Sequence, residues 1–265
     1  MSAQRVLFVN QEITPYLETS YMSIIGRYLP QSIQEKGLEI RSFMPCYGVI
    51  NERRNQLHGI HRLSGQNIII NENSHTLILK VASIQSVRIH TYFIDNEEYF
   101  RQRMLLHDKT GEFLPDNDER AIFYARGVIE TVKKFGWNPD IIHCQGWISC
   151  LVPIFIKKLY VDNPLFTNSK IVYSIYNDTF DKTFRSLASK LKSSDIPQKD
   201  AAAYKQATFE STVKLAINYS DAVVISHKDV SEKIRSHIAR SKKPFFEHKE
   251  DQYGEDYLAL YNSIL

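Results

Sequence analysis

Polar and aromatic side chains at the ends of two strand-like runs are the first candidates for chemistry. Glu12 follows the run 5–10, whereas His143 ends the run 140–143 and Trp147 lies just beyond it. Ligands of open α/β sheets bind outside the carboxyl ends of strands, so Glu12 could contact a ligand; a solvated loop carboxylate explains it equally well. Trp147 could stack on a sugar ring or pack against residues 151–155, and both interpretations stay open. For His143 we favour a histidine satisfied within the core.

Several well-known chemistries lack their motifs. The histidines show no H-E-x-x-H spacing, so we expect no metal site. Ser149 lacks the G-x-S-x-G context that exposes a nucleophile, which leaves hydrolase chemistry unsupported. Neither a phosphate-binding G-K-S/T loop nor a G-x-G-x-x-G fingerprint occurs. The sequence therefore predicts no cofactor.

Composition indicates a globular protein without nucleic-acid or membrane partners. Of 265 residues, 43% are hydrophobic and 24% charged, which is ample for a core. The net charge is +3 and the basic residues are scattered, so nucleic acid is not expected. Three cysteines without a C-x-x-C pair indicate a reducing compartment. No signal-peptide pattern and no run of roughly 20 apolar residues occurs, so we expect a soluble cytoplasmic protein.

The element pattern predicts an α/β fold with a doubly wound, mostly parallel sheet. A strand at 5–10, a helix at about 18–36 ending at Gly37, and a strand at 39–44 form the first strand-helix-strand unit. A helix at 118–135 precedes the second unit, which runs from a strand at 140–143 through a segment at 147–160 to a strand at 170–175. A helix at 201–218, a strand at 222–225 and a helix at 228–239 follow. Three strands at 67–70, 77–81 and 87–94 predict a β-meander inserted beside this sheet.

We expect one domain over residues 1–240, followed by a linker and a C-terminal helix over 241–265. Residues 241–246 read as the linker and residues 253–265 as an amphipathic helix.

These segments, in this order, resemble the N-terminal half of bacterial starch/glycogen synthases. Those enzymes are two-lobed glycosyltransferases of the GT-B type that transfer glucose from ADP-glucose to a growing α-1,4-glucan. The resemblance spans most of residues 5–230, and the matching stretches are 6–15, 29–30, 45–48, 120–126, 136–143 and 147–159, extended by 163–166 and 175–177. It implies a Rossmann-like N-terminal lobe and a link to α-glucan metabolism.

The first departure from the family concerns the donor phosphates. The family places a lysine and a Gly-Gly pair after the first strand, where this chain has Glu18, Thr19, Ser20 and Tyr21. A carboxylate replaces the cation and side chains replace the permissive glycines, so the resemblance implies poor binding of ADP-glucose. Glu18 and Thr19 remain substrate-binding candidates, although for Glu18 we favour a carboxylate that the helix dipole stabilises without any ligand.

Two further departures concern the sugar. The family has His-Asp-Trp where this chain has Gln145, Gly146 and Trp147, and a histidine where this chain has Tyr176 before Asn177. An amide can hydrogen-bond a sugar hydroxyl but cannot carry charge as imidazolium does. The resemblance therefore implies sugar-binding candidates at Gln145, Trp147, Tyr176 and Asn177, and we assign no catalytic residue.

Three functional hypotheses follow. Because no counterpart of the family's second lobe follows residue 240, we expect no glucose transfer by this chain alone. A partner chain could supply that lobe. By analogy with the family, the helix at 253–265 could dock on such a partner; otherwise it packs on its own domain. The alternative is a non-catalytic glucan- or protein-binding module, a pseudoenzyme. A third is a homo-oligomer paired through an edge strand of the meander.

Overall fold

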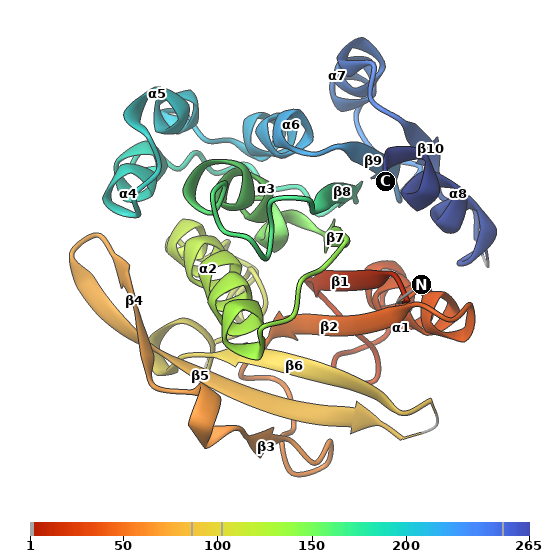
Figure 1. Ribbon diagram of the computed structural model, residues 1–265. Coiled ribbons are helices and arrows are strands. Elements are labelled where there is room, and N and C mark those ends of the chain that lie inside the picture. Colours follow the sequence, from red (N-terminus) through yellow and green to blue (C-terminus); the bar gives the residue numbers. More distant parts are fainter. Residues whose placement is uncertain (1–2, 86, 102, 251) are drawn as a thin grey trace.

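The computed structural model describes residues 3–85, 87–101, 103–250 and 252–265 (Figure 1). Within these ranges ten strands form one sheet in the order β10-β9-β8-β7-β1-β2-β6-β5-β3, and β4 pairs with β5. The strands are β1 Arg5–Asn10, β2 Glu39–Pro45, β3 His58–Gly59, β4 Gln66–Ile70, β5 Asn73–Ile84, β6 Ile89–Asp95, β7 Ile141–Gln145, β8 Lys170–Ile175, β9 Ala222–Ile225 and β10 Phe245–Glu247. The predicted α/β class and mostly parallel sheet are confirmed.

Helices cover both faces of the sheet (Figure 1). The longer ones are α1 Tyr21–Glu35, α2 Asn117–Phe135, α4 Leu187–Ser193, α6 Phe209–Tyr219, α7 Glu232–Ser241 and α8 Glu255–Ile264. The shorter ones are η1 His61–Leu63, η2 Glu97–Arg101, η3 Trp147–Ser149, α3 Val152–Ile154, η4 Phe155–Leu159, α5 Gln198–Ala201 and η5 Ala202–Tyr204. No helix in the described ranges has the length and apolar character needed to span a membrane.

Strand β1 lies at the centre and divides the core in two. Its side chains alternate, so Val6 and Phe8 pack with α1 and α8, whereas Leu7 and Val9 pack in the larger cluster with α2. Parallel pairing aligns Val9 with Phe43 on β2 and with Cys144 on β7. The carboxyl ends of β1, β2 and β7 therefore meet at one edge, where a ligand is expected.

The meander is part of the main sheet, not an addition beside it. Strand β6 pairs in parallel with β2, and β5 then runs antiparallel to β6. A tight turn with positive φ at Asn71 (49°) and Glu72 (68°) joins β4 to β5, as the polar sequence at this point indicates.

Several boundaries differ from the prediction because of caps and short strands. Helix α1 begins at Tyr21 and not at residue 18, because the Ser20 side chain caps it. The segment 147–160 forms short helical pieces and no continuous helix. Residues 245–247, which overlap the expected linker, form β10, paired in parallel with β9. Helix α8 packs on its own domain through buried Tyr257 and Tyr261.

Candidate functional site

A crevice of about 680 Å³ lies at the carboxyl end of β1, beside the N-terminus of α1. It brings together Glu12, Glu18 and Thr19, three of the residues predicted from sequence. The other lining residues are Thr14, Pro15, Tyr16, Leu17, Ser20, Val49, Asn51, Arg54, Asn55, Met104 and Leu105. Amide, hydroxyl and carboxylate groups thus mix with apolar and aromatic side chains, a combination that suits a ligand with both polar groups and apolar faces.

The N-terminus of α1 is capped by its own side chains. Ser20 Oγ accepts a hydrogen bond from the Ser23 N–H at 3.0 Å, and Ser23 Oγ accepts one from the Ser20 N–H at 2.8 Å. The Ser20 hydroxyl also donates to Glu12 Oε2 at 2.5 Å. The helix end that could otherwise hold a phosphate therefore already has bonded donors and an adjacent carboxylate.

Gly26 on α1 sets the position of the Glu12 backbone. A Cβ atom at residue 26 would lie 2.1 Å from the Glu12 carbonyl oxygen. This is far shorter than a van der Waals contact, so the backbone would have to shift. The loop after β1 therefore packs against the helix only because residue 26 has no side chain.

Tyr176 and Asn177 line a different pocket of about 390 Å³ beside α6 and α7. Tyr176 is buried, and its hydroxyl donates to Gln145 Oε1 at 2.8 Å, whereas Asn177 is exposed. The structure thus does not gather all the predicted residues into one cavity.

Gln145 and Trp147 lie inside the core between these two pockets. Trp147 is 1% exposed, its Nε1 donates to Thr212 Oγ1 at 2.8 Å, and its ring stacks on Phe184 with centroids 5.6 Å apart. Gln145 is fully buried, and its Nε2 has no hydrogen-bond partner among the described residues. Of the two interpretations of Trp147, the packing one agrees with this geometry.

His143 is a core residue, as favoured from sequence. Its Nδ1 lies 2.6 Å from the Tyr261 hydroxyl on α8, and its Nε2 lies 2.7 Å from Ser174 Oγ. Burial lowers the pKa of His143 to about 3, so the imidazole stays neutral.

Sequence reasoning missed two polar residues, Gln11 and Asp178, that hold the turn after β7. Gln11 Oε1 accepts from the Ile148 N–H at 3.0 Å, and Asp178 Oδ2 accepts from the Trp147 N–H at 2.7 Å. Gln11 precedes Glu12 and Asp178 follows Asn177 in the sequence, at the same strand ends, and these positions could have marked them as candidates.

Asp178 titrates close to neutral pH. Burial raises its pKa to about 6, the charge of Glu12 adds to this rise, and the Trp147 N–H opposes it. A carboxyl group that changes charge near neutral pH therefore lies between the crevice and the turn after β7.

One group of potential metal ligands occurs among the described residues: Cys46, Glu52 and Asp95, whose ligand atoms lie within 4.8 Å of one another. The Lys80 ammonium lies 2.5 Å from Glu52 Oε1 and 2.8 Å from Asp95 Oδ2. Burial raises the pKa of the Cys46 thiol to about 12, which disfavours the thiolate that a metal requires. This group is an ion-pair cluster with its own internal cation.

The fold agrees with comparisons to known proteins. Residues 5–248 match the family model described as the starch synthase catalytic domain, and the chain belongs to that family. The resemblance seen in the sequence is thereby confirmed.

Among curated relatives, glycogen synthase of Chlorobium luteolum is 40% identical over 174 residues, which are 65% of this chain and 36% of that protein. Glycogen synthase of Chlorobium limicola is 38% identical over the same shares. The chain thus spans about a third of the length of these relatives.

Among solved structures, the catalytic domain of Starch Synthase IV from Arabidopsis thaliana, bound to ADP and acarbose, has a TM-score of 0.76 at 18% identity. The match covers 93% of this chain and 51% of that one. It supports the predicted lobe fold of a two-lobed glycosyltransferase.

Proposed function

We propose that this lobe binds α-glucan in the crevice beside α1 and does not transfer glucose from ADP-glucose on its own. The observation that carries the proposal is the N-terminus of α1, where Ser20 and Ser23 cap the helix and Glu12 accepts from Ser20.

A nucleotide diphosphate meets unfavourable electrostatics in this crevice. Among the described lining residues, the carboxylates of Glu12 and Glu18 outnumber the guanidinium of Arg54. Two unit charges at about 8 Å interact by roughly 2 kcal/mol at an effective dielectric constant of 20, so each carboxylate opposes a phosphate by that order. Displacing Ser20 from the helix end would cost about 1 kcal/mol more.

A neutral sugar meets no such penalty. Carboxylates accept hydrogen bonds from hydroxyl groups, and the amides of Asn51 and Asn55 both accept and donate them. Leu17 and Val49 offer apolar contact to ring faces. The starch synthase neighbour was solved with ADP and acarbose, and family membership supports a sugar ligand here.

Incubation of the purified chain with ADP-glucose and glycogen tests the transfer half of the proposal. We expect no incorporation of glucose, and incorporation by the pure chain would refute the proposal. Incorporation that appears only when cell lysate is added would support a partner chain that supplies the donor lobe.

Titration with maltooligosaccharides tests the binding half. We expect millimolar affinity that Asn51→Ala weakens about threefold, since one hydrogen bond contributes about 0.5–1.5 kcal/mol. Asn163→Ala, on a turn remote from the crevice lining, is the matched control. No detectable binding at millimolar sugar would remove the glucan assignment.

A further inference from the structure

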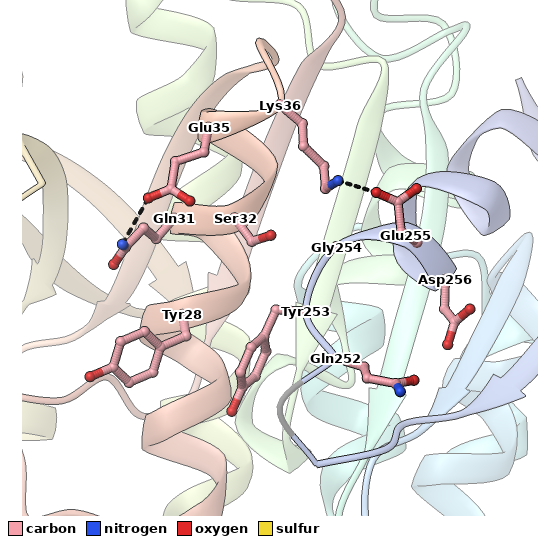
Figure 2. A pocket seen from close by; sticks show the side chains of 10 residues that line it. All are labelled: Tyr28, Gln31, Ser32, Glu35, Lys36, Gln252, Tyr253, Gly254, Glu255 and Asp256. Carbon is pink, nitrogen blue, oxygen red and sulfur yellow. Dashed lines mark hydrogen bonds and ion pairs between the residues drawn. The ribbon is translucent and has the colours of Figure 1, made fainter.

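A second cavity lies between α1 and the segment that leads into α8 (Figure 2). Its volume is about 620 Å³, within the range of small-molecule sites. It is lined by Tyr28, Gln31, Ser32, Glu35, Lys36, Gln252, Tyr253, Gly254, Glu255 and Asp256. We call it the α1–α8 groove.

Two tyrosines form the aromatic part of the groove. Tyr28 on α1 is 42% exposed and Tyr253 is half-buried, and their ring centroids are 6.0 Å apart with planes tilted by 37°. Figure 2 shows the two rings next to each other. Tyrosine combines an apolar ring with a polar hydroxyl, which suits a ligand that has both apolar faces and hydroxyl groups.

The polar part of the groove suits a neutral ligand. Gln31 Nε2 donates to Glu35 Oε1 at 2.9 Å, and Lys36 forms an ion pair with Glu255 (Figure 2). Among the described lining residues, the carboxylates of Glu35, Glu255 and Asp256 therefore exceed the one ammonium, which itself is paired. Phosphorylated ligands and nucleic acids are disfavoured, whereas hydroxyl groups find many acceptors.

Aromatic rings connect this groove to the N-terminus of α1. Tyr28 contacts Tyr253, Tyr253 lies 5.4 Å from His248, and His248 lies 6.2 Å from Tyr21. Tyr21 and Tyr28 are seven residues apart, about two helical turns, and so share one face of α1. We call this series the ring ladder.

The ring ladder begins where the sequence departs from its family. Tyr21 directly follows the Ser20 cap that lines the crevice, at a position where the sequence resemblance implies a glycine. Tyr21 and His248 also line a small cavity of about 220 Å³ at the ends of β9 and β10. Tyr21 is therefore the first ring of a series that leads away from the crevice.

We propose that the α1–α8 groove, with the ring ladder, is a second binding site for α-glucan chains. This inference rests on the proposed function, because it extends the same ligand class from the crevice to a second surface. A polysaccharide that contacts both sites dissociates more slowly than one that contacts either alone.

Hydrogen-exchange mass spectrometry of the full chain with and without maltoheptaose separates the two sites. We expect protection in peptides covering residues 28–36 and 252–258, and also in peptides covering 12–20 and 49–55. A cello-oligosaccharide of the same length is the ligand control and should protect neither region.

The pattern of protection distinguishes failure of the groove from failure of the crevice. Protection confined to residues 12–20 and 49–55 would overturn the groove and leave the crevice proposal standing. Protection confined to 28–36 and 252–258 would support the groove and overturn glucan binding in the crevice. No protection at millimolar ligand would overturn both.

Affinity electrophoresis in gels containing glycogen adds a test by substitution. The double variant Tyr28→Ala with Tyr253→Ala should bind glycogen at least fivefold more weakly than the wild type. The matched variant Tyr28→Phe with Tyr253→Phe keeps both rings and should lose less than twofold. Equal loss in both variants, or no loss in either, would contradict a stacking role.

Discussion

Polar side chains are accessible at one half of the sheet edge and buried at the other. Beside β1, Glu12, Glu18 and Thr19 line an open crevice. Beside β7 and β8, Gln145, Trp147 and Tyr176 are enclosed in the core, although they follow their strands just as closely. We call these the open half and the sealed half.

The difference arises from what packs over each strand end. Three phenylalanines cover Trp147 in the sealed half: Phe113, Phe180 and Phe184, which come from distant parts of the chain. In the open half, Ser20 caps α1 and donates to Glu12, and the strand end faces an open crevice. A position at the carboxyl end of a strand is thus not enough for ligand contact. Whether the side chain is accessible depends on what packs over that strand end.

Trp147→Ala should have the largest effect, because it empties the centre of the sealed half. We expect the free energy of unfolding to fall by about 3–5 kcal/mol, measured by urea denaturation. Trp147→Phe keeps most of the packing and should cost clearly less. A loss under about 1 kcal/mol together with weaker glucan binding would make the sealed half a ligand site and break the comparison.

Asp178→Asn should change how stability depends on pH, because Asp178 lies between the two halves. The folded pKa of about 6 is raised above the ordinary 3.8, so the folded state holds the proton more tightly than the unfolded state. The wild type therefore loses stability from this group as pH rises from about 4 to 6, by roughly 2 kcal/mol in total.

The variant has no charge to bury and should gain on the wild type by that amount between about pH 4 and pH 7, measured by urea denaturation at each pH. Near pH 4 both side chains are largely neutral, which provides the internal control. If the variant instead becomes less stable than the wild type as pH rises, the hydrogen bond from the Trp147 N–H, and not burial, dominates the pKa of Asp178.

Glu18→Lys should sharpen the electrostatic character of the open half. Because Glu18 is exposed, water and salt screen its charge well below the roughly 2 kcal/mol given above for one carboxylate. Replacing it by an ammonium is therefore expected to strengthen ADP binding about tenfold, or about 1.4 kcal/mol, in calorimetric titrations. Glu18→Gln removes the charge without reversing it and should give a smaller gain. Unchanged ADP affinity in both variants would mean that the Ser20 cap alone excludes the phosphates.

Tyr176→Phe should have the smallest effect. Loss of the hydroxyl leaves Gln145 Oε1 without its donor and should cost about 1 kcal/mol of stability. Maltooligosaccharide affinity should stay within twofold of the wild type, since the residue is buried. A larger loss of affinity at unchanged stability would place Tyr176 in a sugar site.

Local patterns were enough to predict most of the sheet and three residues that line the crevice. The strand-helix-strand order follows from apolar runs and periodicity, and Glu12, Glu18 and Thr19 follow from strand ends and the family motif. The sequence left packing and sugar stacking equally open for Trp147, because its cover comes from phenylalanines far away in sequence. It did not indicate that Gln145 is buried. Strand β10 has three residues and no alternation to detect, and Gln11 and Asp178 act through backbone groups that no motif marks.

The lack of space for a side chain at Gly26 limits which substitutions this protein tolerates. Even alanine there would push the first loop outward, so the width of the crevice depends on a residue inside the helix that forms its wall. A change at a site that no ligand touches would therefore alter binding, whereas changes at the exposed rim residues are free to adjust affinity in small steps.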